Sequence, residues 1–229
     1  GSYDLNANRV VNLRLEHCHM NHICDRTRWG VVGTNFCKNI ILDNCTLSRM
    51  DVHMGVSGEY RIRNCRLGHM GLNAIGRGIL TVENSHLYGT AFIKFRSDYG
   101  STWEGTIKIR DCRWTPNCGE PSEAFVFHVQ NDGRHNFGYP CSMPRMISIE
   151  NLEIEDFYHS KVYLFTDPDD FPEDSSPKTS AGKPPFSYQW VEAIQIQNLT
   201  TASGKPLLLS TNPRLASHLA LHDPEKSIE

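Results

Sequence analysis

The sequence predicts an all-β solenoid, in which short parallel strands stack in successive coils. One short phrase, an alternation of apolar and polar residues that ends at Asn or Asp and is often followed by Cys, recurs along the chain. The first two spacings are equal, since 64 − 44 = 20 and 84 − 64 = 20. Such a period indicates coils that bury their apolar faces only against their neighbours. The repeats end their alternation at Asn44, Asn64, Asn84, Asp111, Asn151 and Asn198.

Alternation with a period of two indicates strands rather than helices, because successive side chains of a strand point to opposite faces. The apolar positions of each repeat should therefore share one core. These positions are Ile40 and Leu42, Tyr60 and Ile62, Leu80 and Val82, Ile107 and Ile109, Ile147 and Ile149, and Ile194 and Ile196.

The outward positions of the same strands alternate in charge from one repeat to the next. Opposite charges on neighbouring strands stabilise their pairing by roughly 0.2–1 kcal/mol each. This pattern predicts a structural ladder of ion pairs that fixes the register. The ladder consists of Asp43, Arg63, Glu83, Arg110 and Glu150.

A second apolar alternation follows each Asn by about nine or ten residues, which predicts two strands per coil. The longer gaps between repeats predict loops that leave the coil. They are residues 25–36, 97–106, 115–123, 132–145 and 167–188. We therefore expect one solenoid domain over residues 1–212, with a long mobile loop at 167–188, and a C-terminal tail, 213–229, that caps the last coil.

Four of the eight cysteines occupy the position after the repeated Asn, and Ser85 occupies it once. Equivalent residues of stacked strands lie ~4.8 Å apart, whereas a disulfide needs Cβ atoms within roughly 3.5–4.5 Å. The pattern thus predicts a column of buried thiols, formed by Cys18, Cys45, Cys65 and Cys112. The sequence leaves open whether Cys24, Cys37, Cys118 and Cys141 form disulfides.

Composition excludes several classes of partner. A formal net charge of −3 over 229 residues does not favour nucleic acid, and no apolar run is long enough for a membrane span. The segment HCHMNHIC, residues 17–24, carries metal-ligand types, but its first two residues fill the Asn and Cys positions of the repeat. We therefore predict no metal site and no cofactor. The sequence does not fix the oligomeric state.

Coils of about twenty residues with Asn at the turn resemble the right-handed single-stranded parallel β-helix of the pectin-lyase-like superfamily. The resemblance covers most of residues 10–212 and implies about six or seven coils. It also implies an extracellular, cell-surface or periplasmic location. It does not fix the reaction, because the superfamily includes lyases, hydrolases, epimerases, esterases, phage tailspikes and inert scaffolds.

Outward positions on the second strands bring candidate functional residues onto one patch. Cations of this patch could neutralise a uronate carboxylate and acidify the adjacent C–H, while an imidazole or amine moves the proton. We therefore expect Asp51, His53, Lys94 and Arg96 to be catalytic, and Asn73 and His128 to bind substrate. The alternative interpretation is an outward polar face that is simply solvated.

The phrase SRMDVHMG resembles the Asp-x-His signature of alginate C5-epimerases and of their β-helical lyase relatives. In this resemblance, Asp51 and His53 correspond to the Asp and His of the signature, and Val52 occupies the position where the family usually has Pro. It implies that His53 is an acid or base. Hydrolysis by paired carboxylates is disfavoured, because the predicted strands carry no such pair.

The loop RSDYGSTWEG adds Asp98, Tyr99 and Trp103 as substrate-binding candidates, with the two aromatic rings forming a lip beside Lys94 and Arg96. Alternatively, Trp103 folds back over the core. The leading hypothesis is a carbohydrate-active lyase or epimerase that acts on an acidic polysaccharide. The competing hypothesis is a non-catalytic glycan-binding or structural module of a larger surface or phage-fibre-like protein.

Overall fold

The computed structural model describes residues 3–20, 30–96, 103–116, 123–129, 141–166, 188–189, 191–210 and 221–222. These residues form a 17-stranded sheet and a two-stranded sheet, β13 (Cys141–Ser142) with β16 (Tyr188–Gln189). Every strand pairing in the described ranges is parallel, and these ranges contain no helix. This is the arrangement expected when coils stack in parallel.

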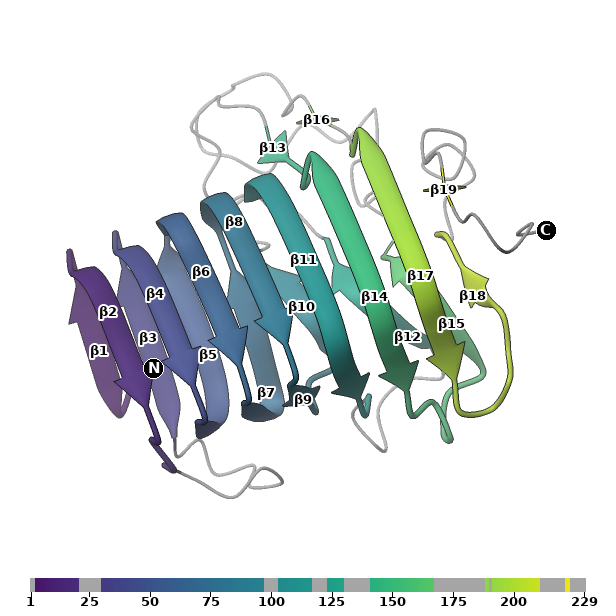
Figure 1. Ribbon diagram of the computed structural model, residues 1–229, viewed down its shortest axis with the longest axis horizontal. Coiled ribbons are helices and arrows are strands. Elements are labelled where there is room, and N and C mark those ends of the chain that lie inside the picture. Colours follow the sequence, from purple (N-terminus) through teal and green to yellow (C-terminus); the bar gives the residue numbers. More distant parts are fainter. Residues whose placement is uncertain are drawn as a thin grey trace, which may run out of the picture.

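The chain alternates between two files of strands, one in front of the other in Figure 1. The front file contains β2 (Val11–Glu16), β4 (Lys38–Asp43), β6 (Ser57–Arg63), β8 (Gly76–Glu83) and the first parts of β11 (Trp103–Trp114), β14 (Met146–Ile154) and β17 (Ala193–Thr201). The rear file contains β1 (Leu5–Asn8), β3 (Val31–Asn35), β5 (Thr46–Met54), β7 (Arg66–Ala74), β10 (Ala91–Phe95), β12 (Glu123–His128), β15 (Lys161–Phe165) and β18 (Leu207–Leu208).

A third, shorter file of pairings lies between the other two, directly after each Asn bend. Here Arg66 of β7 pairs with His86 of β9 (His86–Leu87), which pairs in turn with Arg113 of β11. We call these residues and their equivalents the bend file. The sequence alternation revealed only two strands per coil, because two residues are too few to show a period.

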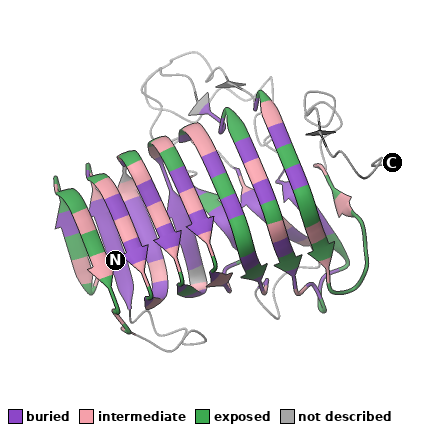
Figure 2. Cartoon of the chain, viewed as in Figure 1, coloured by how far each residue is buried: buried purple, intermediate pink, exposed green. Residues whose placement is uncertain are grey.

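The expected core is confirmed. All twelve inward positions predicted from the sequence are buried, and burial alternates along the strands in Figure 2. In the rear file the core includes a column of aromatic rings, with Phe127 stacked between Phe95 at 6.3 Å and Phe165 at 5.3 Å. The repeated apolar residues thus pack on their equivalents in neighbouring coils, as the period requires.

The first coil bends at His17 and the later coils bend at the repeated Asn or Asp, and all these residues adopt the left-handed backbone conformation. The φ angle is between 45° and 55° at each of these positions, and Asn tolerates this region better than other non-glycine residues. Side-chain amides link the bends: Asn84 Nδ2 donates to Asn64 Oδ1 at 2.7 Å, and Asn198 Nδ2 donates to Asn151 Oδ1 at 2.9 Å. A carboxylate cannot donate, so Asp111 only accepts, from Asn151 Nδ2 at 2.7 Å.

The predicted ladder of outward charges is formed in part: among the described residues, ion pairs join two of its four steps, and Arg63–Glu83 and Arg110–Glu150 are not paired. Arg63 Nη2 lies 2.7 Å from Asp43 Oδ2, and Arg110 Nη2 lies 3.1 Å from Glu83 Oε2. These pairs are partly exposed, and each such pair contributes little to the stability of the fold. They favour the observed strand register, because a shift of the register would separate the opposite charges.

The thiols of the predicted column are free and not joined by disulfides, but only Cys45, Cys65 and Cys112 are buried, whereas Cys18 is half-buried. Cys65 Sγ donates to Arg63 O at 3.0 Å, and Ser85 Oγ makes the equivalent bond to Glu83 O at 2.8 Å. Burial raises the pKa of Cys65 and of Cys112 to about 12. These thiols therefore serve as packing groups and not as nucleophiles. Cys37 is also free and buried, whereas Cys24, Cys118 and the Cys141 side chain lie outside the described part.

Two of the predicted loops are wrong in part, because each contains residues of a strand. Residues 25–36 contain β3, in which Gly33 and Thr34 are both buried, so that its sequence does not alternate between apolar and polar residues. Residues 97–106 contain the start of β11. The expected loop 167–188 lies outside the described residues except for Tyr188. Of the predicted tail, the structure describes only β19 (Leu221–His222), which pairs with β17. The domain boundaries stay a prediction.

Replacing Asn84 tests the bend. Asn84→Gly should lose mainly the side-chain hydrogen bond, about 1 kcal/mol of unfolding free energy, whereas Asn84→Ala should lose about 2 kcal/mol because Ala also strains the left-handed conformation. Urea denaturation of the two variants measures the difference. Equal destabilisation would show that the backbone conformation is not the limiting requirement.

Candidate functional site

The polar positions that alternate with the core residues of the rear file form a continuous row, but Asp51 and Asn73 are buried and not on an outward face as expected, whereas Lys94 is exposed. Asn73 pairs with Asp51 on one side and with Lys94 on the other, and Lys94 pairs with His128. Adjacent members are therefore one strand spacing apart, ~4.8 Å. We call Asp51, Asn73, Lys94 and His128 the rear row.

Asp51 is the most buried member of the rear row. Only 2% of its side chain is exposed, although the residue points away from the core alternation. Its carboxylate accepts hydrogen bonds from Tyr3 Oη at 2.8 Å and Asn73 Nδ2 at 3.1 Å. It also forms ion pairs with Arg49 Nη2 at 3.1 Å and Arg96 Nη1 at 3.4 Å.

Tyr3 covers Asp51 because a glycine leaves room for its ring. Gly33 is the partner of Asp51 in the neighbouring strand, and a Cβ atom at Gly33 would lie 2.6 Å from Tyr3 Cδ1. The sequence reasoning missed Tyr3, since nothing in the repeat connects it with Asp51. Arg49 could have been found, because it lies two residues before Asp51 and hence on the same side of the strand.

The surroundings of Asp51 keep its carboxyl group ionised. Burial alone would raise the pKa of Asp51, but the Arg49 charge, the hydrogen bonds from Asn73 and Tyr3, and the Arg96 charge outweigh it and lower this pKa below its usual value. An ionised carboxylate that already has four partners is a poor proton acceptor. The geometry makes Asp51 an anchor for Arg49 and Arg96.

His128 is the neutral imidazole of the rear row. Burial, with the nearby Lys94 charge, lowers the pKa of His128 to about 4. Among the described residues, no hydrogen-bond partner reaches its buried Nδ1 atom. Near neutral pH the ring therefore carries no charge and can accept a proton.

His53 lies two residues beyond Asp51. Its Nδ1 atom lies 3.0 Å from Asn35 Oδ1, and an amide oxygen only accepts, so Nδ1 carries the proton in this contact. This hydrogen bond fixes the ring orientation.

The expected aromatic lip is not formed by Trp103. The side chain of Trp103 is fully buried, with its ring 6.3 Å from that of Tyr60, so it belongs to the core and cannot stack on a sugar. This agrees with the alternative interpretation of the sequence, in which Trp103 folds back over the core. Asp98 and Tyr99 lie outside the described residues.

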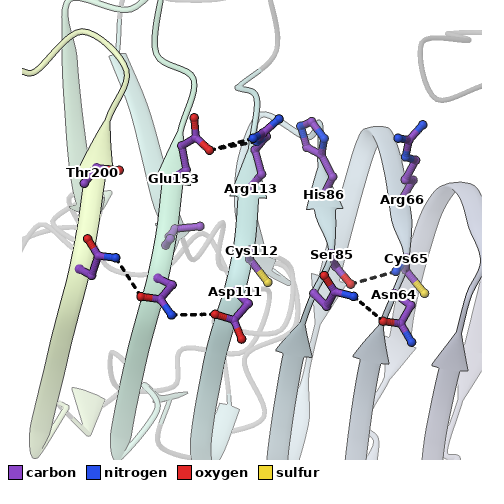
Figure 3. Close-up of a pocket in the computed structure, with 14 residues that line it drawn as sticks. Asn64, Cys65, Arg66, Ser85, His86, Asp111, Cys112, Arg113, Glu153 and Thr200 are labelled. Atoms are coloured by element: carbon purple, nitrogen blue, oxygen red, sulfur yellow. Dashed lines mark hydrogen bonds and ion pairs between the residues drawn. The ribbon is translucent and has the colours of Figure 1, made fainter.

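A groove of about 620 Å³ follows the Asn bends on another side of the coil, which the sequence reasoning did not single out (Figure 3). Figure 3 shows two levels of side chains, the bend amides and carboxylate at one level and, at the other, polar side chains that include the charged Arg66, Arg113 and Glu153. We call this the bend groove. Its polar lining comprises Asn64, Asn84, Asp111, Asn151 and Asn198 at the first level, and Arg66, His86, Arg113, Glu153 and Thr200 at the second.

Comparison with known proteins gives one informative similarity. The chain is 31% identical over 121 residues to a capsule KL64-specific depolymerase of Klebsiella phage P510. The matched region covers 48% of this chain but only 12% of that protein. No protein-family model matches the chain, and no solved structure matches it.

Within the described ranges, no helix has the length and apolar character needed to cross a membrane.

Asp51→Asn tests the anchor. Removing one partner of a buried ion network should lower the unfolding free energy by roughly 3–5 kcal/mol at pH 7. Folding lowers the pKa of Asp51, so ionised Asp51 stabilises the folded state above about pH 4, the usual pKa of a carboxyl group. This contribution to the unfolding free energy is lost as the pH falls through the pKa of Asp51 in the folded state.

Urea titrations between pH 7 and pH 3 measure both effects. The wild type should lose more stability than Asp51→Asn over the acidic part of this range. Parallel losses in both proteins would contradict the assignment of a lowered pKa to Asp51.

Proposed function

We propose that this chain is a polysaccharide-active parallel β-helix module of the pectin-lyase-like type, which binds an acidic polysaccharide across the rear row and acts on it as a lyase or epimerase. The all-parallel sheet and its repeated bends support the fold. Similarity to a capsule depolymerase supports a polysaccharide ligand and a surface or extracellular place of action.

The observation that carries the proposal is the pairing of Lys94 with His128 beside the anchored arginines. Arg49, Arg96 and Lys94 carry three positive charges and Asp51 one negative charge, so these groups sum to 3 − 1 = +2. A net positive cluster next to a neutral imidazole suits a uronate, whose carboxylate needs neutralising before its C5 proton becomes acidic.

In the proposed lyase reaction, His128 takes the C5 proton of a uronate held by Lys94 and Arg96. The electrons of the broken C–H bond form the C4–C5 double bond, the C4–O glycosidic bond breaks, and the leaving oxygen acquires a proton. In an epimerase, the C4–O bond stays intact, and a proton from solvent adds to the opposite face of C5 while His128 keeps the proton that it removed. Asp51 positions the two arginines in both cases.

One observation favours the competing, non-catalytic function. The Asp51 carboxylate is fully engaged by protein groups, which is what a rigid binding surface requires and what a proton-transfer carboxylate would avoid. A glycan-binding module would use the same cations without moving a proton.

An assay for unsaturated uronate products tests the proposal. The wild-type chain, incubated with a panel of uronate polymers and with KL64 capsule, should produce ultraviolet absorbance, and His128→Gln should lower the rate by about 10²–10⁴-fold. Lys108→Gln, an exposed change on the front file, is the control that should leave the rate unchanged. His53→Gln tests the other imidazole.

If no polymer gives absorbance, lyase action is excluded, and NMR of the C5 configuration then tests epimerisation. If both assays are negative while acidic polymers still bind, the module is a binding protein.

The pH profile is a further prediction for His128. If this imidazole is the base, kcat/KM should fall on the acidic side with a midpoint near pH 4, the pKa of His128, rather than near the usual histidine value of about 6.5. Initial rates between pH 3 and pH 8 measure the midpoint, with thermal unfolding at each pH to confirm that the chain is folded. A midpoint near 6.5 would assign the proton transfer to a different histidine.

A further inference from the structure

We propose that the bend groove is a second glycan-binding site, which holds an acidic oligosaccharide with one of its anionic groups at Arg66. This inference rests on the proposed polysaccharide ligand, but it does not depend on proton transfer at the rear row. The groove, about 620 Å³, is in the size range of sites that bind small ligands.

The amides of the bends give one level of the groove its hydrogen-bonding capacity. A ladder amide has two N–H donors and two acceptor positions, and the ladder uses only part of them. The ladder is interrupted where Asp111 follows Asn84, since a carboxylate cannot donate to the Asn84 amide. Among the described residues no donor reaches Asn84 Oδ1, so this oxygen and the carboxylate of Asp111 can accept from ligand hydroxyls.

The charges of the second level are unequal along the groove. Arg113 is neutralised by Glu153, at 3.0 Å from Nη2, and lies 3.6 Å from Glu155. Arg66 is exposed and forms no ion pair within the described part of the chain. Arg66 is therefore the arginine of the groove whose positive charge is available to pair with an anionic group of a ligand.

His86 lies between Arg66 and Arg113, and its ring is held by neighbouring side chains. Its Nε2 atom lies 2.7 Å from Thr115 Oγ1, and its Nδ1 atom lies 3.0 Å from Tyr88 Oη. The rings of His86 and Tyr88 are stacked, with their centroids 4.1 Å apart. Thr115 in turn donates to Glu155. These contacts fix the middle of the groove wall, so little side-chain entropy would be lost on binding.

An oligosaccharide fits this lining better than the other polymers that use cationic grooves. The polar groups recur with the strand spacing, ~4.8 Å, which suits a chain of hydroxyl-bearing rings. Single-stranded nucleic acid relies on aromatic stacking and a continuous basic track. Here the Tyr88 and His86 rings stack on each other, and acidic Asp111 and Glu153 interrupt the basic track.

The bend groove and the rear row use different parts of the same coil. Strand β7 contributes Arg66 to the groove at its start and Asn73 to the rear row near its end, on the rear side of the molecule in Figure 1. Variants at one site therefore leave the side chains of the other in place.

Calorimetric titration with two matched probes tests the inference. The probes are an acidic oligosaccharide prepared from polygalacturonate, and the same oligosaccharide with its carboxyl groups reduced to alcohols. Arg66→Ala should weaken binding of the acidic probe about tenfold or more, and Arg66→Lys should restore part of it. Arg77→Ala, at another exposed arginine outside the groove lining, should have no effect. The reduced probe should not distinguish Arg66→Ala from the wild type.

The rear-row variant Lys94→Gln separates this inference from the proposed function. If Lys94→Gln abolishes binding while Arg66→Ala leaves it unchanged, glycan binds only at the rear row and the groove inference is wrong. If Arg66→Ala weakens binding but all variants lack lyase and epimerase activity, the groove stands and the catalytic proposal fails. Absence of binding of the acidic probe to the folded wild type at millimolar concentration overturns the groove inference.

Discussion

The left-handed bend that each coil makes, at Asn or Asp in all but the first, is the constraint on which the rest of the structure depends. A residue with positive φ at the same point of every coil turns the chain by the same amount, so each strand arrives beside its equivalent in the previous coil. The bend thereby fixes the register, and the register decides which side chains become neighbours. The apolar columns, the charge ladder and the rear row all follow from it.

The same constraint accounts for what the sequence could reveal. The inward pairs, such as Ile147 and Ile149, and the ion pair of Arg63 with Asp43 were predictable, because a constant period carries the register through the chain. The order of the rear row was predictable for the same reason. Residues far apart in sequence can be placed together whenever they occupy equivalent positions of a repeat.

Contacts that do not follow the repeat could not be predicted. Tyr3 reaches Asp51 only because Gly33 has no side chain, and no period connects the three residues. Trp103 begins a strand and enters the core, although its neighbours in sequence read as a loop. The bend groove was missed for a different reason. Its Asn residues were interpreted as turn residues of the repeat, and their ability to form hydrogen bonds with a ligand was not considered.

The burial of Asp51 is not explained by stability alone. Replacing a buried ion network by apolar residues of similar size is often neutral or stabilising, because desolvation of the charges offsets their attraction. What such a network supplies is fixed orientation: Arg49 and Arg96 are both tied to one immobile carboxylate, which is itself held by Tyr3 and Asn73. Cations held in advance lose less conformational entropy when an anion binds and require no rearrangement. A buried carboxylate that holds cations beside Lys94 is thus understandable if the rear row meets an anionic ligand, and it is difficult to understand as a purely solvated face.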